Sequence, residues 1–190
     1  MSPNRSALLV MDVQKGIVQR FVSSVDALAP FQRAVAAARA SGVLVIFVKI
    51  AFRDGYPEVS KRNKSFSTIS TRGSMTLSDA STEIHEALNP RPDEPTVNKL
   101  RVSAFAGSDL EVVLRAREIT ALVLAGIATS GVVLSTLREA ADMDYELTVL
   151  SDACLDADPE VHRVLIEKVF PRQAEVTTVD AWAGSVKASR

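Results

Sequence analysis

The sequence predicts an α/β fold, a three-layer, doubly wound, mostly parallel sheet with helices on both faces. Short apolar runs alternate with stretches whose apolar residues recur at helical spacing. The runs are continuous, which is typical of parallel strands buried on both faces. Right-handed crossovers then favour the doubly wound topology. No repeat or linker divides the 190 residues, so we expect a single domain over 1–190.

Two strands and a helix are predicted in the first fifty residues. Ala7 to Met11 (ALLVM) is the first buried strand, and Val43 to Ile50 is the second. Gly42 stops the helix between them. The apolar residues of that helix recur at helical spacing: Leu28, Phe31, Val35 and Ala38.

A polar stretch from about Arg53 to Ser78 follows, and we expect it to be a long loop. Loops of this length often cover a site. A short helix is expected over Glu83 to Leu88. Thr96 to Lys99 is the third strand.

In the second half of the sequence we expect three more strands and three helices. The strands are expected at Ala121–Ala125, Leu147–Leu150 and Glu175–Val179. The residues beyond the sixth strand either pack or fray.

Start signals mark two of these helices. Ser108 and Glu111 are interpreted as a capping box for the first. Asp158 and Pro159 open the last, with proline at its first position. The middle helix is marked by its apolar face: Val133, Leu137 and Ala140.

Composition narrows the function class. The net charge is −1, so no basic field attracts nucleic acid or a membrane surface. The single cysteine, Cys154, excludes an internal disulfide. His85 and His162 lie far apart in sequence, so no metal site is expected. The N-terminus lacks signal-peptide features, and we expect a cytoplasmic protein.

Three features follow predicted strands, where a doubly wound sheet binds ligands. Asp12 can accept a proton, or it can simply cap a turn. Lys99 can stabilise negative charge or hold Asp12 ionised, although a single lysine is more often a surface residue. The small-residue turn from Ala125 to Val132 can bind an anion through its N–H groups, or its glycines can serve only a tight connection.

Other ligand classes are disfavoured by missing motifs. The first turn lacks the glycine pattern of dinucleotide-binding folds, and no phosphate-binding loop motif or nucleophile elbow is present. Gln14 stands where a haloacid-dehalogenase-like phosphatase would need an aspartate.

From about Ala7 to Asp180 the chain resembles the isochorismatase-like (cysteine hydrolase) superfamily. The segments LLVMDVQKG, VNKLRVSAF and LVLAGIATSGVVLSTLREAADMDYELTVLSDAC carry the resemblance, in the family's order. FRDGYPEVSKRNKSFS is similar to a loop of one branch. The resemblance implies strand order 3-2-1-4-5-6, a small-molecule substrate and no cofactor. It also implies a homodimer or homotetramer, to which the apolar segment around Trp182 could contribute.

The resemblance assigns a triad that this chain does not complete. Asp12 matches the family's proton acceptor, and Lys99 matches the lysine that supports its charge. The nucleophilic cysteine usually stands three residues after the motif threonine, here Thr129, but position 132 is Val132. Cys154 is rejected as a substitute, because relatives carry a non-catalytic cysteine in the same segment.

Further site residues follow from the resemblance. It implies a cis peptide bond between Ile127 and Ala128, and we expect the N–H groups of Ala128 and Val132 to form an oxyanion hole. Thr129 is expected at the substrate site. Gln14 is expected to orient Asp12 or to contact ligand.

Two phenylalanines and one missing motif complete the expected site. Phe66 and Phe105 either line the pocket or are ordinary core residues. Zinc-bearing nicotinamidases of this superfamily carry an Asp-x-His near the end of the second strand. Here that segment reads Lys49-Ile50-Ala51-Phe52-Arg53, so neither the metal nor nicotinamidase activity is expected.

Two functions compete. The first is a hydrolase acting on a C–N or C–O bond of a small molecule through Asp12 and Lys99, with water as the nucleophile. Thiol-free members of the family use the aspartate as an acid and generally carry glycine where this chain has the bulkier Val132. The alternative is a catalytically inactive member that serves as a small-molecule-binding or assembly protein.

Overall fold

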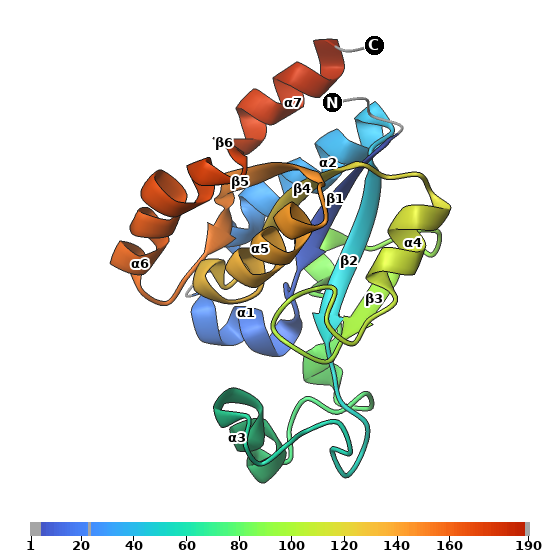
Figure 1. Cartoon of the computed structure of the whole chain (residues 1–190), viewed down its shortest axis with the longest axis vertical. Helices are drawn as coiled ribbons and strands as arrows, with labels where there is room; N and C mark the ends of the chain where they lie inside the picture. Colours follow the sequence, from blue (N-terminus) through green and yellow to red (C-terminus); the bar gives the residue numbers. More distant parts are fainter. Residues whose placement is uncertain (1–4, 23, 189–190) are drawn as a thin grey trace.

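The computed structural model describes residues 5–22 and 24–188. Six parallel strands form one sheet in the order β3-β2-β1-β4-β5-β6, so the expected fold class and strand order are confirmed (Figure 1). The strands are β1 Ser6–Met11, β2 Leu44–Ile50, β3 Thr96–Lys99, β4 Ala121–Ile127, β5 Glu146–Leu155 and β6 Glu175–Thr177.

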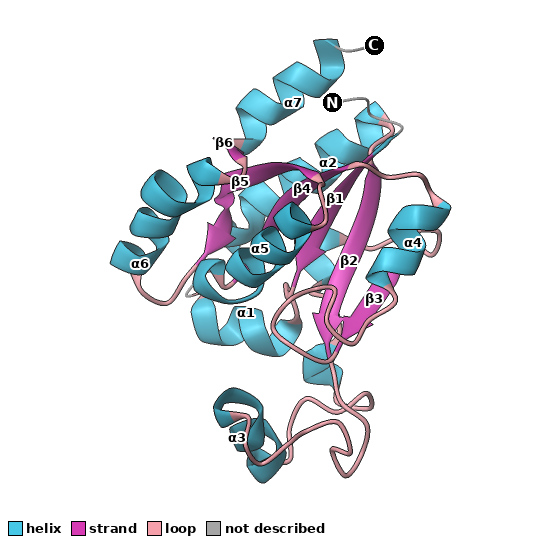
Figure 2. Cartoon of the chain, viewed as in Figure 1, coloured by secondary structure: helices cyan, strands magenta, loops and turns pink. Residues whose placement is uncertain are grey.

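Helices cover both faces of the sheet, as Figure 2 shows. The α-helices are α1 Lys15–Phe21, α2 Ala29–Ser41, α3 Lys64–Arg72, α4 Leu110–Ala116, α5 Leu134–Asp142, α6 Pro159–Val164 and α7 Val179–Ala188. Shorter 3₁₀ and π-helical turns are η2 Val25–Leu28, η3 Ala80–Thr82, η4 Glu86–Leu88, η5 Thr129–Val133, η6 Leu165–Val169 and η7 Phe170–Arg172.

Strand β1 divides the core into two layers. Leu9 and Met11 face one cluster with residues of α4 and α5, and Leu8 and Val10 face the other with residues of α1, α2 and α7. All six residues of β1 are buried, as expected for a central parallel strand. Burying each large aliphatic side chain stabilises the fold by about 1.5–3 kcal/mol. Among the described residues, no helix is long and apolar enough to cross a membrane.

The polar stretch over 53–78 is not a continuous loop, so that expectation was wrong. It contains α3, which lies beyond the carboxyl ends of the strands (Figure 1). Asn63 caps α3 by accepting from the N–H of Phe66 at 3.0 Å, and Gly73 ends it in the left-handed region at φ 64°. Only Phe66 of this helix is buried, so its apolar periodicity was weak.

Two expected helix starts also differ. The helix predicted over 83–88 is only the 3₁₀ turn η4. Ser108 does not form a capping box. Its hydroxyl accepts from Leu110 N at 3.2 Å, while Glu111 pairs with Arg115.

The last two strands differ in length from the expectation. Strand β5 continues past the polar residues Ser151 and Asp152. Its register with β4 shifts between Leu124 and Gly126, so that Cys154 pairs with Gly126. Strand β6 ends at Thr177, and Val179 begins α7, which packs on the sheet rather than fraying.

Candidate active site

Asp12 and Lys99 meet at the carboxyl edge of the sheet. Asp12 directly follows β1, in the left-handed region at φ 58°, and its N–H donates to Val48 O at 2.8 Å. Lys99 ends β3 and reaches back across β2. Its Nζ lies 3.0 Å from Asp12 Oδ2 and donates to Arg101 O at 2.9 Å. Strand order therefore brings together two side chains that are 87 positions apart in the sequence.

The pair is almost completely removed from solvent. The Lys99 side chain is 2% exposed and that of Asp12 is 9% exposed. Burial raises the pKa of Asp12 above its ordinary value, and the ammonium of Lys99 offsets part of that rise. Asp12 Oδ1 is buried and has no hydrogen-bond partner among the described residues. One carboxylate oxygen is thus held by lysine, and the other remains able to accept a proton.

Val132 lies in the apolar core on the same side of β1. It is 2% exposed and belongs to the cluster that contains Met11, Ala104 and Phe105. One helical turn further on, Thr136 Oγ1 accepts from Ala104 N at 2.9 Å. The loop that follows Lys99 therefore packs on the helix face that carries Val132.

The turn between β4 and α5 contains the expected cis peptide bond, between Ile127 and Ala128. Gly131 and Val133 donate back to Ala128 O at 3.1 and 3.3 Å. Asp156 accepts from Ser130 N at 2.7 Å. Burial works to raise the pKa of Asp156, but its hydrogen bonds, chiefly from Ser130, hold that pKa below its ordinary value. One N–H group of this turn is therefore already bound to an anion.

A histidine beside this turn was missed by the sequence reasoning. His162 Nδ1 lies 2.8 Å from the hydroxyl of Thr129, which is fully buried. The signal was available, because Asp158-Pro159 fixes the start of α6. Asp158 accepts from Glu160 N and Val161 N and so sets which face His162 occupies.

Gln14 binds backbone groups rather than Asp12. Its amide nitrogen donates to Ile50 O at 2.9 Å and Thr82 O at 2.8 Å, and its oxygen accepts from Ile50 N at 3.0 Å. These bonds fix the end of β2. A ligand contact by Gln14 stays a prediction.

The two phenylalanines lie in different clusters. Phe66 packs edge-on against Phe52 with ring centroids 5.6 Å apart, and the Arg101 guanidinium lies 6.0 Å from its ring centroid. Phe66 therefore covers the carboxyl edge near Lys99. Phe105 is 8% exposed in the core and lies 6.1 Å from the ring of Tyr145.

Cys154 lies in β5 opposite Gly126 of β4, and it is buried in the same apolar cluster as Val132. Desolvation raises the pKa of its thiol to about 12, so little thiolate forms near neutral pH. Among the described residues, no three His, Cys, Asp or Glu side chains gather in a way that could hold a metal ion.

The chain is similar in sequence to proteins of one hydrolase family. A family model described as Isochorismatase domain matches residues 6–181. The isochorismatase family protein YwoC of Bacillus subtilis is 30% identical over 183 residues, which cover 96% of this chain and 95% of that protein. Ureidoacrylate amidohydrolase RutB of Stutzerimonas stutzeri is 30% identical over 218 residues, covering 99% of this chain and 82% of the relative.

Solved structures agree at the level of the fold. A cysteine hydrolase from Pseudomonas syringae pv. phaseolicola 1448A superposes with a TM-score of 0.90 at 27% identity, covering 100% of this chain and 96% of its own. An isochorismatase family protein from Burkholderia thailandensis gives a TM-score of 0.85 at 30% identity, with coverages of 97% and 96%.

Proposed function

Since the chain belongs to the isochorismatase family of hydrolases, we propose that it hydrolyses a C–N or C–O bond of a small molecule through Asp12 and Lys99, with water as the nucleophile. The observation that carries this proposal is the buried Asp12 carboxylate. Its Oδ2 is fixed by Lys99, and its Oδ1 has no partner among the described residues. Such an oxygen is suited to take a proton from a water molecule.

The reaction needs one proton transfer in each direction. Asp12 Oδ1 takes a proton from water while the water oxygen bonds to the electrophilic carbon. The tetrahedral intermediate then collapses, and the electron pair of the breaking bond goes to the leaving nitrogen or oxygen. That atom receives the proton from Asp12, which is again a carboxylate. Because burial raises the pKa of Asp12, its carboxylate is a stronger proton acceptor than an exposed aspartate.

Lys99 stabilises the Asp12 carboxylate before the first of these steps and after the second. At 3.0 Å in a buried site, its positive charge is screened much less than at the surface. The backbone N–H groups of Ala128 and Val132 are proposed to bind the developing oxyanion. Thr129 and Phe66 are proposed to contact the substrate, and Phe105 is proposed to limit the apolar end of the site.

The substrate class is proposed from the named relatives. Several of them are ureidoacrylate amidohydrolases at about 30% identity. We therefore favour an amide or carbamoyl C–N bond over an ester or vinyl ether. Val132 requires that this chain reach the same bond type without a thiol.

A specific observation supports a second function. Val132 is 2% exposed among apolar neighbours, and a site that has lost its nucleophile can still bind a small molecule. In this alternative the protein is a catalytically inactive member of the family that serves as a small-molecule-binding or assembly protein.

A hydrolase screen with an Asp12→Asn variant tests the proposal. Wild-type protein is assayed on amides, carbamoyl compounds, esters and vinyl ethers. We expect Asp12→Asn to lower kcat at least about a hundredfold on any active substrate, because the proton acceptor is lost. Asp93→Asn, on an exposed loop, is the matched control and should leave kcat unchanged.

The variant must be shown to fold, because removing one partner of a buried ion pair costs about 3–5 kcal/mol. Circular dichroism and the midpoint of thermal unfolding provide that check. Activity that survives Asp12→Asn in folded protein would reject the mechanism. Inactivity of the wild type across the screen, with saturable binding of a screen compound, would favour the binding function.

A further inference from the structure

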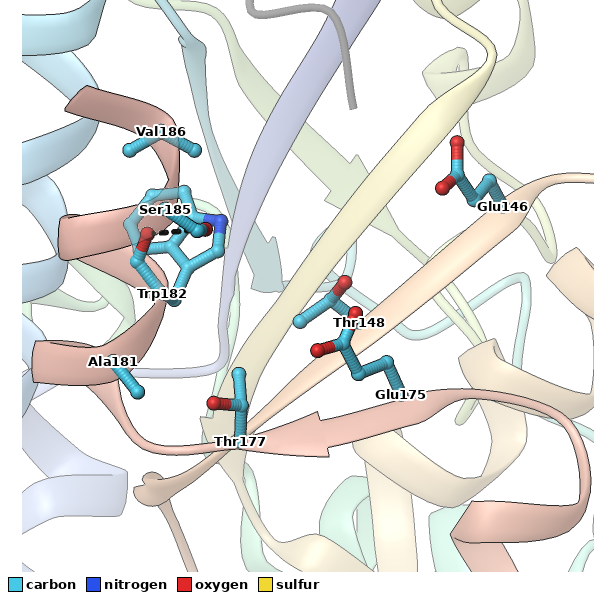
Figure 3. Close-up of a pocket in the computed structure, with 8 residues that line it drawn as sticks. All are labelled: Glu146, Thr148, Glu175, Thr177, Ala181, Trp182, Ser185 and Val186. Carbon is cyan, nitrogen blue, oxygen red and sulfur yellow. Dashed lines mark hydrogen bonds between the residues drawn. The ribbon is translucent and has the colours of Figure 1, made fainter. Parts of the chain in front are cut away.

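A hollow lies at the end of the sheet opposite to Asp12 and Lys99, between α7 and the first residues of β5 and β6. Its volume is about 310 Å³, and Figure 3 shows the residues that line it. We call it the β5–β6 hollow. Its polar lining consists of Glu146 and Thr148 from β5, Glu175 and Thr177 from β6, and Trp182 and Ser185 from α7.

The hollow is far from Asp12. Glu146 pairs with Ala121, and Ala121 pairs with Ser6, so Glu146 is level with the first residue of β1. Asp12 comes six positions later, which corresponds to about 20 Å along a strand. Whatever binds in the hollow therefore does not touch the proposed active site directly.

Trp182 presents an unused donor to this hollow. The residue is 4% exposed, and its Nε1 is buried without a hydrogen-bond partner among the described residues. Figure 3 shows the indole nitrogen on the side of α7 that faces the strands. A buried indole N–H usually donates a hydrogen bond, because leaving the buried donor without an acceptor costs about 1–3 kcal/mol. An acceptor on a ligand would satisfy it.

Two carboxylates form the opposite wall. Glu175 pairs in register with Thr148, and Glu146 precedes Thr148 by two residues on the same face of β5. Among the described residues neither glutamate forms an ion pair, and no residue lining the hollow is positively charged. The wall therefore favours a cation with several N–H donors.

We propose that the β5–β6 hollow binds a small amine or guanidine that also carries a hydrogen-bond acceptor. The cationic group lies between Glu146 and Glu175, and the acceptor takes the indole N–H of Trp182. Charge-assisted hydrogen bonds of this kind are about twice as strong as neutral ones.

The single tryptophan makes the test direct. Trp182 is the only tryptophan in the chain, so its fluorescence and its indole N–H resonance report on this hollow alone. The probe is Nα-acetyl-L-argininamide, which has one guanidinium and two carbonyl acceptors. Nα-acetyl-L-citrullinamide has the same shape without the charge. We expect the charged probe to saturate the signal and the neutral probe to bind at least about tenfold more weakly.

Variants assign the contacts. We expect Glu146→Gln and Glu175→Gln each to weaken probe binding about tenfold in isothermal titration calorimetry. Trp182→Phe should weaken it as well, because the indole donor is lost. Glu111→Gln is the control, because it removes the same charge from α4, which lies beside β3 at the other edge of the sheet (Figure 1). It should leave the affinity for the probe unchanged.

Three results would overturn the proposal. One is the absence of saturation by the charged probe at millimolar concentration. Another is equal binding of both probes. The third is a dimer, detected by analytical ultracentrifugation, that dissociates in the glutamate variants while no probe binds, since a second copy would then occupy the hollow.

Discussion

At the residue scale, Val132 determines what chemistry remains possible. A valine side chain supplies neither a nucleophile nor a proton, so any hydrolysis must proceed through water or another group. Its burial in the cluster with Met11 and Phe105 also gives it a packing role. The same side chain therefore offers no thiol at this position and takes part in the packing of the core.

Shortening Val132 should cost stability. We expect Val132→Ala to lower the free energy of unfolding by about 2 kcal/mol, because two buried methyl groups are lost and a cavity remains. Val112→Ala is the matched control, since Val112 is 69% exposed on α4 and its truncation should change stability by less than about 0.5 kcal/mol. Urea unfolding measures both. Equal losses in the two variants would show that Val132 is not packed as described.

At the element scale, the turn after β4 depends on close packing against β1. A Cβ added to Gly126 would meet Met11 O at 2.8 Å and Val133 Cγ2 at 3.3 Å. Gly126 also lies level with Met11, the residue before Asp12. A methyl group there would push β4 away from the candidate site.

Two glycine substitutions should therefore have opposite effects. We expect Gly126→Ala to destabilise the fold by about 1–3 kcal/mol through overpacking against backbone. Gly184→Ala lies in α7 with nothing within 4 Å of the new Cβ, and it should stabilise the fold by about 0.5–1 kcal/mol. Thermal unfolding of the two variants measures the contrast. A stable Gly126→Ala protein would contradict the described packing of β1 on β4.

Sequence alone predicted the elements with strong apolar runs and missed those with weak ones. Strands β1 and β2 were predicted to within one residue of their observed bounds, because ALLVM and VLVIFVKI are continuous apolar runs. Helix α3 was missed because one buried residue, Phe66, gives no periodicity, although Asn63 and Gly73 marked both of its ends. The length of β5 depends on a shift in its register with β4, which no local sequence pattern indicates.

At the scale of the whole molecule, the parallel sheet brings residues that are distant in the sequence close together in space. The contact between Asp12 and Lys99 could be predicted, because both follow strands at one edge. The proximity of His162 to Thr129 depends on how α6 packs against the turn after β4, so strand order alone did not predict it. The saturation of Gln14 by backbone groups likewise depends on the path of the chain near Ile50 and Thr82.

Cys154 should make the stability of the whole molecule depend on alkaline pH. In the unfolded chain its thiol ionises near its ordinary pKa of 9.0, whereas burial raises the pKa in the folded chain to about 12. Between those values the unfolded state releases a proton that the folded state retains, so stability falls as pH rises, by at most about 1.4 kcal/mol per pH unit. Below the unfolded value the thiol is protonated in both states and contributes no slope.

Urea unfolding at pH 8, 9.5 and 10.5 measures this effect on the wild type and on Cys154→Ala. We expect the wild type to lose more stability with pH than the variant, because only the wild type carries the thiol. Rapid alkylation of native Cys154 by iodoacetamide at neutral pH, without unfolding, would contradict the burial that this prediction assumes.

We propose that water, and not a group of the enzyme, attacks the substrate at the Asp12–Lys99 pair. The most direct test is rapid-quench intact-mass analysis during turnover of the best substrate found by screening, with Val132→Cys as the comparison. We predict that the wild type turns over with no covalent adduct, while Val132→Cys accumulates an acyl adduct on the new thiol. A covalent adduct on wild-type protein would contradict the account.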